Sequence, residues 1–95
     1  MKEYNIEYLR KYVSNFTMKE LEKLDLYLLE DLTHSYVDVD LNIRYLRKYG
    51  VTNFDRVIPN MVEYLLLSHN EFIKKIHNYE KTMNKEDVIS LIENM

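Results

Sequence analysis

The sequence contains no cysteine and only one glycine and one proline, Gly50 and Pro59. Without cysteine there is no disulfide, no thiolate nucleophile and no zinc site built from Cys ligands. Tight β-turns depend on glycine and proline, so the scarcity of both argues against a hairpin-rich, all-β fold. These absences favour a helical protein that works inside the cell.

Long apolar runs are absent as well. No stretch approaches the roughly 18 apolar residues that are needed to span a bilayer. The first seven residues are too acidic for a signal peptide. We therefore expect a soluble, cytoplasmic protein with no membrane partner.

The chain does have enough apolar surface for one core. Of its 95 residues, 46% are hydrophobic and 31% are charged, a balance typical of a globular domain rather than a disordered chain. We expect a single domain over residues 1–95, because two independent cores do not fit into this length. The net charge is −3, and residues 1–40 hold the acidic excess, with nine acidic and five basic groups. This balance disfavours nonspecific nucleic-acid binding through the N-terminal half.

An internal repeat is the most informative pattern in the sequence. Residues 5–12, Asn-Ile-Glu-Tyr-Leu-Arg-Lys-Tyr, return as residues 42–49 with seven of eight positions identical at an offset of 37. A Tyr-Leu-Leu match between residues 27–29 and 64–66 keeps this offset, and a fainter third copy ends the chain. Repeats of this kind are typical of stacked helix pairs. We place the copies at about residues 5–30, 42–67 and 76–95.

The apolar spacing within the copies is helical. Met18, Leu21 and Leu24 recur at every third position, as one face of a helix requires. Residues 17–20, Thr-Met-Lys-Glu, form a capping box that starts a new helix, and Gly50 suits the left-handed end of another. We expect an all-α, small helical-repeat domain of about five to seven short helices, with two good helix-turn-helix copies and a partial third. The predicted helices span about residues 3–13, 18–33, 40–49, 53–58, 60–67, 69–81 and 85–93.

Further residues set boundaries in the second half of the chain. Ser68 repeats the capping signal before the helix that contains Phe72, and either Asn84 or Thr82 is a candidate cap for the last helix. Pro59 cannot lie deep inside a helix, because it lacks an amide hydrogen and its ring clashes with the preceding turn. We therefore expect a short helix that ends near Ile58 and a separate turn after it.

The second copy also resembles a known repeat. It is similar to the helical repeat of mitochondrial transcription termination factors at residues 45–52, Tyr-Leu-Arg-Lys-Tyr-Gly-Val-Thr, and then at Asp55, Ile58 and residues 65–68, Leu-Leu-Leu-Ser. The resemblance covers about residues 42–95. That family winds many such repeats into a solenoid whose concave, basic side holds duplex nucleic acid. The resemblance therefore implies a helical-repeat fold and a nucleic-acid partner.

No pattern in the sequence indicates catalysis. There is no Gly-rich phosphate loop, no nucleophile elbow and no Ser-His-Asp order. His69 and His77 are eight residues apart rather than four, so they do not form a pair of metal ligands on adjacent helical turns. Asp38 and Asp40 have the spacing of a cation pair in an extended segment, but we interpret them as N-caps of a helix before Leu41. We expect no enzymatic activity, no metal and no cofactor.

Two surfaces are candidates for binding, and the first is a basic stripe. Each repeat supplies an Arg-Lys pair beside tyrosines, and such pairs hold phosphates while the rings stack on bases. The alternative is that these cations are solvated near helix ends, where they favour the helix dipole. The basic stripe consists of Arg10, Lys11, Arg44, Arg47 and Lys48.

The second candidate is an acidic face. A small acidic protein can occupy the nucleic-acid-binding groove of another protein by matching its charge. The alternative is that the acidic residues form only a solvated face. The acidic face consists of Glu20, Glu22, Asp25, Glu30, Asp31, Asp38 and Asp40.

Three functional hypotheses follow from these patterns. The leading one is a non-enzymatic protein-protein interaction module with a protein partner. The second is nucleic-acid binding through the two Arg-Lys pairs, and the third is a phage-type inhibitor that binds a nucleic-acid-handling protein. A homodimer also fits, because three repeats are near the lower limit for a continuous core.

Overall fold

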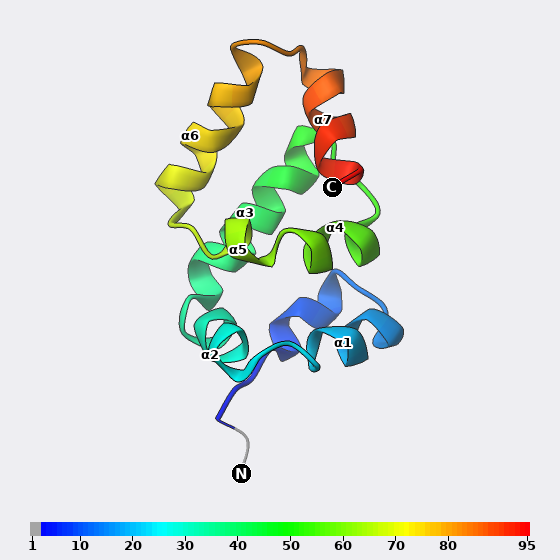
Figure 1. Cartoon of the computed structure of the whole chain (residues 1–95), viewed down its shortest axis with the longest axis vertical. Coiled ribbons are helices and arrows are strands. Elements are labelled where there is room, and N and C mark those ends of the chain that lie inside the picture. Colours follow the sequence, from blue (N-terminus) through cyan, green and yellow to red (C-terminus); the bar gives the residue numbers. More distant parts are fainter. Residues whose placement is uncertain (1–2) are drawn as a thin grey trace.

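The computed structural model describes residues 3–95, and within this range it contains seven α-helices, one 3-10 helix and no strand (Figure 1). The all-α prediction is confirmed. Within the same range, no helix combines the length and the apolar character that crossing a bilayer requires. The elements are η1 (Glu7–Lys11), α1 (Asn15–Leu21), α2 (Leu26–His34), α3 (Tyr36–Tyr49), α4 (Phe54–Asn60), α5 (Val62–Leu65), α6 (His69–Glu80) and α7 (Lys85–Glu93).

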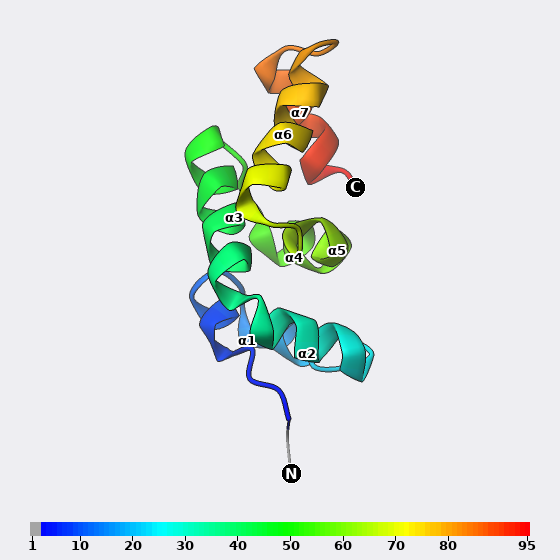
Figure 2. The ribbon, with the colours of Figure 1, turned by 90° about the vertical axis from the view of Figure 1, so that its left-hand side faces the viewer.

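The helices form three stacked pairs. The pairs are η1 with α1, α3 with α4, and α6 with α7. One row runs η1, α3, α6, and α3 packs against both of its neighbours. The other row runs α1, α4, α7, and α4 packs against both of its neighbours. The short helices α2 and α5 connect the pairs and protrude on one side, while α3 lies along the opposite side (Figure 2).

The core runs through all three pairs. Ile6 and Leu9 of the first copy and their sequence equivalents Ile43 and Leu46 are all buried. Full burial of one such side chain contributes roughly 1.5–3 kcal/mol. The repeat therefore marks equivalent core positions in successive pairs.

The two copies of the repeated segment nevertheless have different backbones, and the helix predicted over residues 3–13 is wrong. The first copy forms only the 3-10 helix η1, whereas the second copy forms the last two turns of α3. In the first copy the side chain of Asn5 accepts a hydrogen bond from the Glu7 amide at 3.0 Å, so the segment starts as a local turn. In the second copy, residues 36–41 already form helical turns that the segment extends, and extending a helix is easier than nucleating one.

The helix predicted over residues 18–33 is also wrong, because the chain forms α1 and α2 there. The N-cap of α1 is Ser14, whose hydroxyl accepts from the Thr17 amide at 3.3 Å. Thr17 itself is buried inside α1, so the predicted capping box does not form. Asp25 then caps α2 by accepting from the Tyr27 amide at 2.7 Å.

α3 begins at Tyr36 rather than near residue 40, so Asp38 and Asp40 lie inside the helix and are not its N-caps. The reason is the core face of α3. Val39 is fully buried and lies four residues before Ile43, on the same side of the helix. It therefore extends the apolar stripe by one turn toward the N-terminus. The helix ends at Gly50, which has a φ of 118° and whose amide donates to the Arg47 carbonyl at 3.2 Å, as a left-handed cap requires.

The C-terminal half follows the predictions more closely. α6 and α7 have the predicted bounds within one residue, and Ser68 and Asn84 are their N-caps. α4 extends past the predicted end to Asn60 and includes Pro59. The proline is tolerated because it lies in the last turn, where only one hydrogen bond within the helix is lost.

Successive pairs are also joined by equivalent polar contacts. The Ser14 amide donates to Oδ1 of Asp55 in α4 at 2.7 Å. The Thr52 amide, at the equivalent position after the second copy, donates to Oε2 of Glu93 in α7 at 2.8 Å. The turns of the first and second pairs are therefore each bound to a carboxylate of the next pair.

Candidate functional site

The outer side of α3 carries apolar residues in its first half and basic residues in its second. Tyr36, Val37 and Leu41 are between 36% and 55% exposed although they are large and apolar. Arg44 and Lys48 follow and are also exposed. Val37, Leu41, Arg44 and Lys48 are spaced by four, three and four residues, so they form one stripe along the helix. We call these five residues the α3 face.

Two hollows flank the α3 face. The first has a volume of about 290 Å³ and lies between η1 and α3. The second has a volume of about 230 Å³ and lies between α3 and the start of α6. Leu41 and Arg44 line both hollows, so the hollows follow each other along α3. Their other lining residues are Tyr8, Lys11, Tyr36, Val37 and Asp40 in the first, and Tyr45, Lys48 and His69 in the second.

The wall of the first hollow is held in place by Tyr8. Its hydroxyl donates to the carbonyl of Leu32 at 2.6 Å. Its ring meets Tyr36 edge to face, with 6.1 Å between the centroids. Burial raises the pKa of the Tyr8 hydroxyl, and the nearby charge of Asp40 raises it further, so the ring stays neutral. The hollow is therefore bounded by an apolar side chain with a fixed position.

Asp40 lies beneath the α3 face at the centre of a polar network. It accepts from the Tyr12 hydroxyl at 2.5 Å, and Nζ of Lys11 lies 2.9 Å from the same oxygen. Nη1 of Arg44 lies 3.6 Å from the other oxygen. Burial alone raises the pKa of Asp40, but the hydrogen bonds from Tyr12 and Lys11 and the charges of Lys11 and Arg44 outweigh burial and leave the pKa below its ordinary value. Asp40 is thus an ionised group whose charge is already matched.

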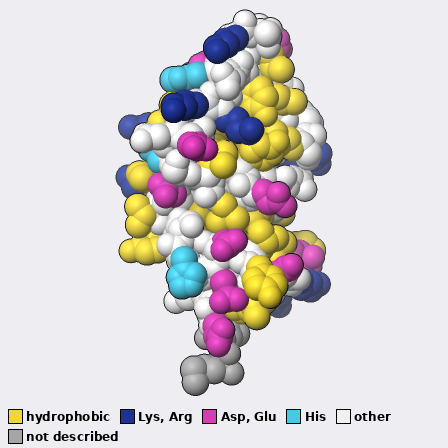
Figure 3. Space-filling model, turned by 60° about the vertical axis from the view of Figure 1, so that its left-hand side comes forward, with side chains coloured by type: hydrophobic (Ala, Val, Ile, Leu, Met, Phe, Trp, Pro, Cys, Tyr) yellow, Lys and Arg dark blue, Asp and Glu magenta, His cyan; other side chains and the backbone are white. Residues whose placement is uncertain are grey.

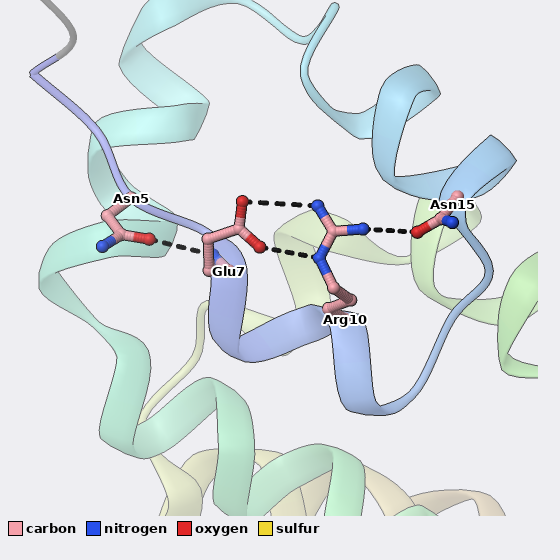
Figure 4. A network of polar contacts seen from close by, with 4 residues as sticks. All are labelled: Asn5, Glu7, Arg10 and Asn15. Atoms are coloured by element: carbon pink, nitrogen blue, oxygen red, sulfur yellow. Dashed lines mark hydrogen bonds and ion pairs between the residues drawn. The ribbon is translucent and has the colours of Figure 1, made fainter.

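The cations of the predicted basic stripe have different partners. Arg47 lies over the Tyr12 ring, with its Cζ 4.9 Å from the centroid, so it joins the network around Asp40 with Lys11 and Arg44. Arg10 does not join this network. It pairs with Glu7 at 2.7 Å and also donates to Asn15, which ties η1 to α1 (Figure 4). The two Arg-Lys pairs of the repeat are therefore not equivalent in space.

The predicted acidic face is also divided. Asp38 accepts from the backbone amide of His69 at 3.2 Å, and Asp40 lies in the network described above. The other five members lie on or beside α1 and α2, where Asp and Glu side chains gather around exposed hydrophobic ones in the lower part of Figure 3. Leu26 and Tyr27 are exposed there. In Figure 2, the α2 ribbon extends to the right below α3.

The histidines lie apart from one another along the stack. The Nδ1 atom of His69 is 2.8 Å from Oδ1 of Asn42, and His77 lies 4.0 Å from Glu80. Within residues 3–95, no three side chains of the His, Cys, Asp or Glu types come together as metal ligands. Every buried side-chain nitrogen or oxygen in this range has a hydrogen-bond partner.

The apolar half of the α3 face was missed by sequence reasoning. Tyr36, Val37 and Leu41 were assigned outside the helix or at its start, so their common side was not recognised. The signal was present, because Val37, Leu41, Arg44 and Lys48 have helical spacing once the helix starts at Tyr36.

Comparison of the chain with protein-family models, with curated proteins and with solved structures gives no significant match.

The Asp40 network gives a test that depends on pH. Asp40→Asn is expected to lower the free energy of unfolding at pH 7 by about 1–2 kcal/mol, because hydrogen bonds to a charged group are replaced by weaker neutral ones. The pKa of Asp40 is lower in the folded chain than in the unfolded one, so its contribution is present above about pH 4 and is lost as the pH falls through the folded value. Urea denaturation between pH 7 and pH 3 measures it.

The difference between wild type and Asp40→Asn should therefore shrink below about pH 4, where a protonated Asp40 is also neutral. Asp31→Asn is the matched control, since the Asp31 side chain is exposed and makes no hydrogen bond or ion pair among residues 3–95. An equal loss for both variants at every pH would contradict this role of Asp40.

Proposed function

We propose that the chain is a non-enzymatic helical module that binds another protein through the α3 face. The observation that carries the proposal is the cluster of Tyr36, Val37 and Leu41, three large apolar side chains exposed on neighbouring turns of one helix. Exposed apolar groups that lie together, with a polar or charged rim, are typical of protein-protein contact sites. Arg44 and Lys48 supply such a rim.

The polar groups around the α3 face support binding rather than catalysis. A catalytic acid or base needs a side chain that is free to exchange a proton with a bound substrate. Asp40 already accepts hydrogen bonds from Tyr12 and Lys11, and Nδ1 of His69 is paired with Asn42. These side chains hold η1, α3 and α6 together, and the surface above them is available for contacts.

The nucleic-acid hypothesis has less support from the same geometry. Phosphate binding depends on Lys and Arg that are free to replace counterions. Arg10 is paired with Glu7 at 2.7 Å and Lys11 with Asp40 at 2.9 Å, so the cations that η1 contributes to the basic stripe are already neutralised. The resemblance to the repeat of mitochondrial transcription termination factors stays a hypothesis about the fold of residues 42–95, and duplex binding is an outcome to be tested.

The proposal predicts that a partner is lost when the apolar half of the α3 face is made polar. The double variant Val37→Ser with Leu41→Ser should recover at least tenfold less partner than wild type in affinity purification from the source cells, because fully burying a Val or Leu side chain contributes roughly 1.5–3 kcal/mol and a tenfold loss of affinity corresponds to about 1.4 kcal/mol. Quantitative mass spectrometry measures the recovery, and circular dichroism checks that the variant is folded.

The matched control is Leu26→Ser with Tyr27→Ser, which removes exposed apolar groups of α2 instead. It should recover the partner as wild type does. The proposal is wrong if both double variants retain every partner, or if recovery depends only on nucleic acid and disappears after nuclease treatment.

A further inference from the structure

We infer that the occupant of the α3 face is an amphipathic acidic segment of the partner protein. Its apolar side chains lie over Val37 and Leu41, and its carboxylates lie over Arg44 and Lys48. This inference rests on the function proposed above and adds the chemistry of the partner to it. Three observations carry it: the charge on the face, the order of the two hollows and the length of the stripe.

The exposed charge on the α3 face is positive although α3 contains two aspartates. Asp38 is bound to the amide of His69, and Asp40 is bound to Tyr12 and Lys11. The charge of Asp40 is therefore matched by Lys11, and Asp38 lines neither of the two hollows. Arg44 is exposed and only 3.6 Å from Asp40, while Lys48 makes no hydrogen bond or ion pair within residues 3–95. The rim thus favours negative charge in a molecule whose net charge is −3.

The two hollows place the apolar and the charged contacts in a fixed order. The apolar walls of the first hollow are the rings of Tyr8 and Tyr36 and the side chain of Val37, and the paired charges of Lys11 and Asp40 also line it. The second is bounded by Arg44, Lys48 and His69. Because Leu41 and Arg44 belong to both, a single segment can enter both without a break. Its apolar residues must then precede or follow its acidic residues along one face.

The length of the stripe fits a short helix or strand. Val37 and Lys48 are eleven residues apart in one helix, which corresponds to roughly 16 Å at the rise of an α-helix. A partner helix of three turns covers this distance with apolar residues on one turn and acidic residues one or two turns later.

A nucleic acid matches only half of this surface. Phosphates suit Arg44 and Lys48, but a sugar-phosphate backbone offers no aliphatic side chain for Val37 and Leu41. A nucleic acid would therefore leave the apolar half of the α3 face exposed to water. An acidic peptide uses both halves.

The test uses the full chain and three fluorescent peptides of 16 residues. The acidic probe is a helix-forming peptide with leucines on one turn and glutamates one and two turns later on the same face. The basic probe replaces these glutamates with lysines, and the polar probe replaces the leucines with glutamines. A DNA duplex of 16 base pairs is the fourth probe. Fluorescence anisotropy at two salt concentrations gives the affinities.

We expect the acidic probe to bind at least tenfold more tightly than each of the other three. Arg44→Glu with Lys48→Glu should reverse the preference in favour of the basic probe, because attraction at the rim becomes repulsion. Lys19→Glu is the control, since Lys19 is an exposed lysine on α1 that has no ion pair within the described residues. This variant should leave the ranking of the four probes by affinity unchanged.

Two outcomes separate this inference from the proposed function. If a cellular partner depends on Val37 and Leu41 but its recovery is unchanged by Arg44→Glu with Lys48→Glu, the protein-binding function stands and the acidic occupant is wrong. If no partner depends on Val37 and Leu41, the proposed function fails first. Tighter binding of the duplex or of the basic probe overturns the inference directly.

Discussion

Phe72→Ala is expected to lower the free energy of unfolding by about 4 kcal/mol, the range found when a buried aromatic side chain is truncated. Phe72 lies in α6, and only 1% of its surface is exposed. Its ring meets Tyr45 of α3 at 90°, with 6.3 Å between the centroids. Small domains are stable by only about 5–15 kcal/mol in total, so this one change removes a large share. Urea denaturation followed by circular dichroism measures the loss.

The structure explains why the surroundings cannot compensate. The gap beside Phe72 has a free volume of only about 10 Å³ and is lined by side chains of α6 and α7 and by Met61, Tyr64 and Met95. Removing the ring opens a cavity between helices whose positions are fixed by other contacts, and the cost rises with the cavity that remains. Within residues 3–95, α6 packs against α3 and α7, and both helices are held by other contacts as well.

Phe16→Ala is the matched control. Phe16 is 72% exposed at the start of α1, so its truncation should change the free energy of unfolding by less than about 0.5 kcal/mol. If Phe16→Ala and Phe72→Ala lower the free energy of unfolding equally, the burial of Phe72 is not the cause of the loss. The pair also separates a core residue from an exposed one of identical type.

The repeat made the burial pattern predictable but not the backbone. Ile6 and Leu9 are buried just as their equivalents Ile43 and Leu46 are, because joining successive pairs needs an apolar residue at each of these positions. The backbone conformation depends on what precedes the segment. α3 already has helical turns before Asn42, whereas η1 follows a turn that Asn5 stabilises, and an eight-residue match contains no information about this difference.

Helix starts were predictable where the candidate caps lie close together. Ser68 is the N-cap of α6 as predicted, and of the two candidates for α7, Thr82 and Asn84, the structure has Asn84 as the N-cap. Around α1, however, Ser14, Thr17 and Asp25 are all good capping residues within a short stretch. The choice among them depends on tertiary contacts: the buried face of α1 includes Thr17, which therefore cannot be a cap.

The sequence predicted several residues of the candidate site, but it did not predict which side chains pair with them in the fold. The basic residues Lys11 and Arg44 were identified from the repeat, but Lys11 finds its partner Asp40 29 residues away in the sequence. Such a pairing follows from how η1 packs against α3, which no local pattern records. The apolar half of the α3 face depended on the start of α3, and an error of four residues in that start concealed Tyr36 and Val37.

Asn42→Ala is expected to lower the free energy of unfolding by about 3 kcal/mol, because it leaves buried polar groups without partners. The Asn42 side chain is fully buried. Its amide nitrogen donates to the carbonyls of Leu65 at 3.0 Å and Leu67 at 2.9 Å, at the end of α5 and just beyond it. Helix ends expose carbonyls that the helix itself cannot satisfy, and Asn42 supplies the missing donors.

The same residue also sets the orientation of His69. Because the amide nitrogen of Asn42 donates to two carbonyls, its oxygen is left to accept from Nδ1 of His69 at 2.8 Å. Asn42→Asp keeps this acceptor but loses both donors and brings a charge toward two carbonyl oxygens. It should therefore be at least as destabilising as Asn42→Ala, although the side chain is almost the same size.

Asn5→Ala is the control that the repeat itself provides, since Asn5 occupies the equivalent position of the first copy. Asn5 is exposed, and within residues 3–95 its side chain makes one hydrogen bond, which it accepts from the Glu7 amide. Its removal should cost less than about 1 kcal/mol, as expected for one solvent-exposed hydrogen bond. Urea denaturation of the three variants tests the difference. Equal losses for Asn5→Ala and Asn42→Ala would mean that the buried contacts of Asn42 do not join α3 to the turn between α5 and α6.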